Sequence, residues 1–187
     1  MSNKTEYVVI GLNSIGRTLA GLLAFGEDGI ITLVDGDKVS EKSLPQGYMP
    51  VDVGLHKTDA VEATLRETSS FLAINKHTNM AAFNDLRDRL VSKISGDTVV
   101  FYCENLSLNG RLNAYEDFKN CCKELYFFGF HPDGTAQFYR AIGGMNLQEK
   151  QLNQIPEGRE NCVEGKKVAA RAFGMHVREK HIAVVEI

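Results

Sequence analysis

Short apolar segments alternate along this chain with longer segments in which apolar residues recur every three or four positions. The short segments are rich in β-branched and aromatic residues, as buried strands are, and the longer ones have the periodicity of amphipathic helices. The predicted strands cover residues 7–10, 30–34, 71–75, 98–102, 125–130, 136–141 and 182–187. The predicted helices cover residues 15–25, 57–67, 83–94, 112–122 and 166–178.

The order of these elements predicts an α/β fold. Regular alternation of strand and helix is typical of a parallel sheet covered by helices on both faces, because parallel strands need crossover connections. The exception is the turn sequence His131-Pro132-Asp133-Gly134, which joins two predicted strands directly. We therefore expect a Rossmann-like three-layer fold, whose mostly parallel sheet carries an antiparallel hairpin at one edge.

Length and composition limit the alternatives. A chain of 187 residues with 43% apolar content can bury one good core, so we expect a single domain over residues 1–187. A net charge of −3 gives no general reason to bind nucleic acid or an anionic membrane. The sequence shows no signal-peptide core and no apolar run of membrane-spanning length, which predicts a cytoplasmic protein. Four cysteines without a C-x-x-C pair are expected to be reduced thiols.

The first predicted strand is followed by a glycine turn of the kind that binds phosphates. Gly11 and Gly16 hold the first and third glycine places of that turn, and Asn13 holds the second. The helix that begins near Ser14 is expected to offer free backbone amides and a positive dipole to a phosphate. Asp35 ends the second predicted strand, where a carboxylate can accept hydrogen bonds from ribose hydroxyls. We therefore expect residues from about 5 to 110 to form a nucleotide-binding half. Residues from about 111 to 187 are expected to form the hairpin, a crossing loop and a terminal helix and strand.

Three further segments carry a resemblance to a known family. They read DGDKV at 35–39, SLPQ at 43–46 and DVGLHK at 52–57. In this order they resemble the ThiF/MoeB/HesA family, the adenylation fold shared with ubiquitin-activating enzymes, whose pattern runs D-x-D-x-V, N-L-x-R-Q and D-V-G-x-x-K. The resemblance covers most of residues 6–142 and is strongest before Lys57.

The resemblance implies an activity, its cofactors and its partners. Members of the family bind ATP and Mg²⁺ and adenylate the carboxyl-terminal glycine of a small ubiquitin-like or sulfur-carrier protein. They are commonly dimers, so a homodimer or a pairing with an active homologue is implied. Asp35 would hold the ribose and Lys57 the ATP phosphates, because fixed cations stabilise the charge that moves onto pyrophosphate.

Site residues follow from the resemblance position by position. The cofactor-binding set is Gly11, Asn13, Gly16, Asp35, Asp37, Lys57, Glu104 and Asn105. The catalytic set is Lys57, Gln46 and Arg111, and Glu104 is the implied Mg²⁺ ligand.

Several of these positions depart from the family pattern. Asn13 replaces a glycine, Ser43 and Gln46 stand where the pattern has Asn and Arg, and Glu104 stands where it has Asp. A neutral amide cannot make the charge-assisted contact of an arginine, and Mg²⁺ demands close octahedral geometry. Cys162 has no flanking motif that would make it a carrier-accepting thiol, so we interpret it as an ordinary loop cysteine.

Three functions remain compatible with the sequence. The first is an active adenylyltransferase that uses ATP and Mg²⁺. The second is a catalytically degenerate relative that serves as a binding or regulatory subunit beside an active partner. The third is an NAD-binding Rossmann module, since residues 11–17 are also similar to the nucleotide-binding regulatory domains of potassium transport proteins. That reading explains Asp35 but leaves the segment 52–57 unexplained.

Overall fold

A computed structural model describes residues 4–26, 29–69, 73–78, 88, 97–104, 106–142 and 152–185. One six-stranded sheet runs through the molecule in the order β3-β2-β1-β4-β5-β6. All neighbouring strands are parallel except β5 and β6, which are antiparallel. The strands are β1 (Thr5–Ile10), β2 (Gly29–Val34), β3 (Ala73–His77), β4 (Thr98–Tyr102), β5 (Glu124–Phe130) and β6 (Ala136–Ile142). The predicted Rossmann-like α/β fold is confirmed.

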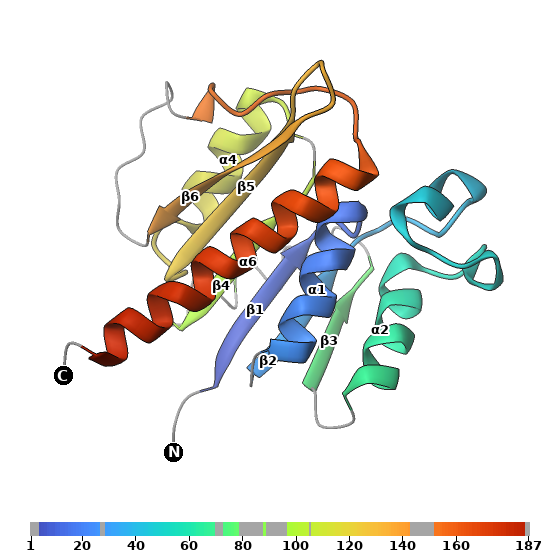
Figure 1. The fold of residues 1–187 in the computed structure, drawn as a ribbon, viewed down its shortest axis with the longest axis horizontal. Coiled ribbons are helices and arrows are strands. Elements are labelled where there is room, and N and C mark those ends of the chain that lie inside the picture. Colours follow the sequence, from blue (N-terminus) through green and yellow to red (C-terminus); the bar gives the residue numbers. More distant parts are fainter. Residues whose placement is uncertain are drawn as a thin grey trace.

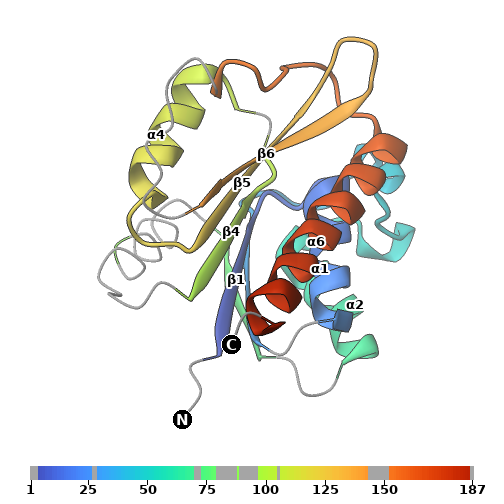
Figure 2. The same cartoon turned by 60° about the vertical axis from the view of Figure 1, so that its left-hand side comes forward.

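Helices cover both faces of this sheet (Figures 1 and 2). Helices α1 (Ser14–Gly26), α2 (Lys57–Thr68) and α6 (Cys162–Val185) lie on one face, and α4 (Leu108–Phe118) lies on the other. The central strand β1 supplies both cores, because successive side chains point to opposite faces. Tyr7 and Val9 belong to the core under α1 and α6, whereas Val8 and Ile10 belong to the core under α4. A strand buried on both sides explains why residues 7–10 form an uninterrupted apolar run.

The hairpin between β5 and β6 was also predicted correctly. Its turn is closed by a hydrogen bond from the His131 amide to the Thr135 carbonyl, at 2.7 Å. Gly134 has a φ of 84°, a conformation that L side chains rarely adopt. Asp133 accepts hydrogen bonds from both the amide and the hydroxyl of Thr135. The turn chemistry read from the sequence therefore positions this antiparallel edge.

The predicted strand at residues 182–187 is wrong. Helix α6 continues to Val185 and includes most of that segment. No proline interrupts the chain between residues 162 and 185, so the helix extends by one hydrogen bond per residue despite the β-branched residues near its end. Strand β6 already pairs with β5 on that side of the sheet. The local β propensity of residues 182–185 therefore does not decide their structure.

Other predicted boundaries also changed. Strand β3 begins at Ala73 and ends at His77, whereas the sequence predicted 71–75. Helix α4 begins earlier than residue 112, because the Ser107 side chain caps it by accepting a hydrogen bond from the Gly110 amide. The predicted helix at 83–94 falls almost wholly outside the described residues. Two short 3₁₀ helices, Glu41–Gln46 and Pro50–Asp52, lie between β2 and α2 and were not predicted.

Among the described residues, no helix is both long enough and apolar enough to cross a membrane.

Candidate functional site

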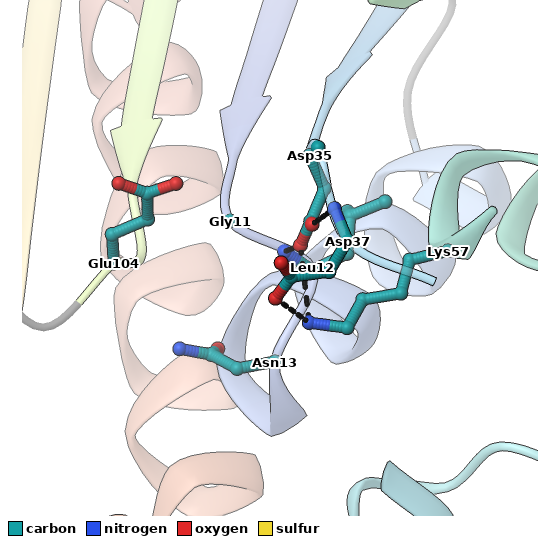
Figure 3. Close-up of a pocket in the computed structure, with 8 residues that line it drawn as sticks. Gly11, Leu12, Asn13, Asp35, Asp37, Lys57 and Glu104 are labelled. Atoms are coloured by element: carbon teal, nitrogen blue, oxygen red, sulfur yellow. Dashed lines mark hydrogen bonds and ion pairs between the residues drawn. The ribbon is translucent and has the colours of Figure 1, made fainter. Parts of the chain in front are cut away.

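A cleft of about 250 Å³ lies where β1, β2 and β4 end (Figure 3). The carboxyl ends of parallel strands meet at one edge of a sheet, which is where ligands bind in open α/β folds. Lining residues come from the turn after β1, the segment after β2, the start of α2 and the end of β4. They are Gly11, Leu12, Asn13, Asp35, Gly36, Asp37, Lys57 and Glu104. The structure thus brings together six of the residues predicted from the sequence.

The glycine turn requires glycine at both of its predicted places. Gly11 has a φ of 84°, and a Cβ atom there would come within 2.9 Å of the Glu104 backbone nitrogen. A Cβ atom on Gly16 would collide with the Gly11 carbonyl oxygen. The Gly11 amide donates to the Val34 carbonyl at 2.8 Å, which ties the turn to β2. These contacts bring the start of α1 close to the strand ends.

Asp35 organises the segments on either side of the cleft. Its carboxylate is buried and accepts hydrogen bonds from the Leu12 amide at 2.7 Å and from the Asp37 amide at 2.8 Å. One carboxylate therefore holds the turn after β1 against the segment after β2. A carboxylate has about four acceptor sites, so a ribose hydroxyl can still donate to it.

Lys57 supplies the positive charge of the cleft. Its ammonium lies 2.9 Å from Asp37 Oδ2 and 3.5 Å from Asp35 Oδ2. Burial alone would lower the pKa of Lys57, but the hydrogen bond to Asp37 and the charge of Asp35 outweigh it, so the pKa lies above its usual value. The side chain is therefore an ammonium at neutral pH, already paired with carboxylates.

Glu104 stands at the end of β4, apart from the Asp35–Lys57 pair (Figure 3). Burial raises the pKa of Glu104, and the nearby charges of Asp35 and Asp37 raise it further. The described residues hold no cluster of three histidine, cysteine, aspartate or glutamate side chains suited to a metal ion. Mg²⁺ usually binds one or two carboxylates together with substrate phosphates, so Glu104 fits it only as part of such a shared site. Asn105, also predicted in this site, lies outside the described residues.

The first turn of α1 differs from the expectation. Its amides were expected to be free, but the Asn13 side-chain oxygen accepts hydrogen bonds from the Ile15 amide at 3.0 Å and the Gly16 amide at 3.2 Å. The Ser14 amide donates to Glu160 Oε1 at 2.9 Å. Asn13 also donates to the Cys103 carbonyl, at 2.6 Å. Asn13 therefore caps the helix and crosslinks β1 to β4 in the place where the family pattern has a glycine.

Two residues of the predicted catalytic set do not line the cleft. Gln46 donates from its side-chain amide to Glu160 Oε2 at 2.8 Å. Arg111 lies on α4 and is only 2% exposed. Its guanidinium donates to the carbonyls of the segment before α6, at Leu152, Ile155 and Pro156. Burial lowers the pKa of Arg111. Arg111 therefore anchors the segment before α6 to α4 through these hydrogen bonds.

Sequence reasoning missed two residues that shape the site. Tyr48 donates its hydroxyl to the Leu12 carbonyl at 2.6 Å, and burial raises the pKa of this phenol. Glu160 reaches the first turn of α1 from the other end of the chain. Neither belongs to a motif, and no spacing signal could have identified them. Cys162 is partly exposed, and burial raises the pKa of its thiol, so its environment does not favour a thiolate.

No protein-family model and no curated protein matches this chain, but solved structures do. A structure of E. coli MccB with AMPCPP and MccA is 17% identical, with a TM-score of 0.69 over 91% of this chain and 54% of that one. A structure of E. coli MccB with ATP is 18% identical, with a TM-score of 0.65 over 91% and 54%. A structure of PaaA is 16% identical, with a TM-score of 0.65 over 94% and 55%.

The chain spans about half the length of these solved structures. At such low identity the likeness shows the fold. The likeness agrees with the Rossmann-like α/β fold expected from the sequence, a mostly parallel sheet that in this chain carries an antiparallel hairpin at its edge.

Proposed function

We propose that this chain binds a nucleotide in the cleft at the end of β1 and belongs to an ATP-dependent system that activates a carboxylate. One observation carries the proposal: the Gly11 turn, Asp35 and Lys57 line a single cleft on a fold that is similar to MccB. The solved MccB structures with ATP and AMPCPP support ATP as the nucleotide.

The lining residues suit different parts of such a ligand. Asp35 can accept a hydrogen bond from a ribose hydroxyl, and the Gly11 turn lines the cleft beside it. Lys57 places a positive charge at the start of α2. Glu104 would share Mg²⁺ with the phosphates, since Mg²⁺ is held by few protein ligands in nucleotide sites. When bound, ATP supplies the adenylyl group that makes a carboxylate reactive.

The proposed acceptor is the carboxyl terminus of a small ubiquitin-like or sulfur-carrier protein. The solved complexes of MccB with MccA support an acceptor presented by another polypeptide. We extend the proposal to an assembly, either a homodimer or a pair with an active homologue, as the resemblance to the ThiF/MoeB/HesA family implies.

Exchange of labelled pyrophosphate into ATP tests this function directly. We expect exchange that depends on an added carrier protein ending in Gly-Gly and that is lost in Lys57→Ala. Lys167→Ala is the matched control, because Lys167 is 64% exposed on α6 and pairs with Glu164 three residues before it. Absence of exchange with every carrier tested, by a folded protein that binds ATP, would exclude the adenylating activity.

A second function, that of a binding or regulatory subunit, is favoured by the first turn of α1. Asn13 and Glu160 already accept the hydrogen bonds of the amides that would hold phosphate. This subunit would bind a nucleotide with no turnover of its own. Thermal shifts with ATP-Mg²⁺ and with NAD separate the ligands, because a ligand that binds only the folded state raises its apparent stability. A shift with NAD alone would instead support an NAD-binding module.

A further inference from the structure

The carboxylate of Glu160 lies at the amino terminus of α1. Its Oε1 accepts a hydrogen bond from the Ser14 amide at 2.9 Å, and its Oε2 accepts one from the Gln46 side chain at 2.8 Å. A helix amino terminus attracts anions because its amides are unpaired and its dipole is positive there. Glu160 therefore occupies the position that an anionic group of a ligand would take.

The remaining amides of this turn are also engaged. Asn13 Oδ1 accepts from the Ile15 and Gly16 amides, and the Asn13 carbonyl accepts from the Arg17 amide at 2.9 Å. Each of the four amides from Ser14 to Arg17 thus has an acceptor within the protein. A phosphate at this turn must displace Glu160, Asn13 or both.

The charges around the cleft also disfavour a bound phosphate. Asp35, Asp37 and Glu104 line it, and Lys57 is the only cation among the described lining residues. That lysine is already bonded to Asp37. Glu160 adds a further carboxylate at Ser14, the residue that follows the lining residue Asn13. The net negative charge of these residues would repel a triphosphate but would not repel an uncharged nucleoside.

We infer that Glu160 determines which part of a nucleotide this cleft accepts: with Glu160 on α1 the cleft favours the nucleoside, and a triphosphate competes with Glu160 for the Ser14 amide. The inference rests on the proposed nucleotide-binding function and adds a specificity residue to it. Asp35 Oδ1 carries one amide hydrogen bond and retains acceptor capacity for a ribose hydroxyl. The protein's own side chains, Glu160 and Asn13, bind the helix amides that the phosphates would otherwise use.

Calorimetric titration with adenosine and with ATP-Mg²⁺ tests this inference. In Glu160→Ala we expect the affinity for ATP-Mg²⁺ to rise about tenfold, because an anion that competes at the helix terminus is removed. The affinity for adenosine should change less than about twofold, because Glu160 lies at the amino terminus of α1 and is not among the residues that line the cleft around Asp35. Glu116→Ala is the matched control: it removes the same charge from a carboxylate that is 62% exposed on α4.

A second variant separates charge from shape. Glu160→Gln keeps an acceptor for the Ser14 amide and removes the charge, so its ATP affinity should lie between those of the wild type and Glu160→Ala. Thermal unfolding of each variant verifies that it is folded.

Equal effects of Glu160→Ala and Glu116→Ala on ATP affinity, with adenosine binding intact, would overturn the inference and leave nucleotide binding standing. Binding of neither ligand by any folded variant would overturn the proposed function, and the inference with it.

Discussion

The ammonium of Lys57 lies 3.5 Å from the carboxylate of Asp35, and the two side chains are only 10% and 7% exposed. They come from different elements, the end of β2 and the start of α2, so their pairing fixes the distance between two sides of the cleft. Lys57 also bonds Asp37, whose side chain is 76% exposed. Because Asp35 is buried and Asp37 is not, the stability of the Asp35 carboxylate depends more strongly on the charge of Lys57.

Substitution of Lys57 by methionine should therefore destabilise the fold as well as the site. We expect the free energy of unfolding to fall by about 1 to 3 kcal/mol, because Asp35 keeps its amide hydrogen bonds but loses its counter-charge. Lys167→Met, which breaks an exposed pair, should cost less than about 0.5 kcal/mol. Urea denaturation measures both. Equal stabilities would show that Asp35 is hydrated rather than paired.

Two glycines of α1 should respond oppositely to alanine. In Gly16→Ala the new Cβ collides with the Gly11 backbone, and we expect a loss of at least about 2 kcal/mol. Gly21 has nothing within 4 Å of the same position. Gly21→Ala should therefore stabilise the protein by about 0.5 to 1 kcal/mol through helix propensity. Thermal unfolding compares the two, and a tolerated Gly16→Ala would contradict the close packing of this turn.

Arg111→Met should separate stability from ligand binding. The guanidinium satisfies carbonyls at 152–156 and lies 3.7 Å from Glu157, so its loss should cost about 2 to 4 kcal/mol. Nucleotide affinity of the folded variant, measured well below its unfolding temperature, should change less than about twofold. Arg66→Met, at an exposed pair on α2, is the control for both measurements. A large loss of affinity with unchanged stability would support the predicted role of Arg111 in the site.

A buried ionic cluster on the far side of the sheet from α4 should control acid stability. Glu124 accepts hydrogen bonds from Tyr126 at 2.7 Å and Arg140 at 3.1 Å, and its Oε2 lies 3.2 Å from His176 Nδ1. Burial alone would raise the pKa of Glu124, but these partners outweigh it and hold the pKa at about 2. Because the folded pKa lies below the unfolded one, the charged form stabilises the protein above about pH 4.5.

That contribution should be lost as the pH falls from about 4.5 to about 2. For a shift of this size we expect a loss of about 3 kcal/mol in the wild type relative to Glu124→Gln, which has no charge to lose in this range. Denaturant unfolding at a series of pH values measures the difference. Parallel pH profiles for the two proteins would show that the cluster does not titrate with folding.

Much of this fold follows from local sequence. Apolar runs at 7–10 and 98–102 identify strands buried on both faces, and the turn at 131–134 identifies the hairpin. Gly11, Asp35 and Lys57 were recognised because each follows a strand or begins a helix in a short motif. Parallel strands place such positions at one edge, so their meeting in a cleft could be expected.

What the sequence determined by itself is the order and type of most elements, the architecture, and the residues of the cleft that lie next to strand ends. The tertiary structure alone decided that Glu160 reaches Ser14, that Arg111 binds the carbonyls before α6, and that residues 182–185 continue a helix. Periodicity and turn chemistry are local, and they act over a few residues. A hydrogen bond between residues 146 positions apart depends on how all the intervening elements pack, and no short pattern encodes it.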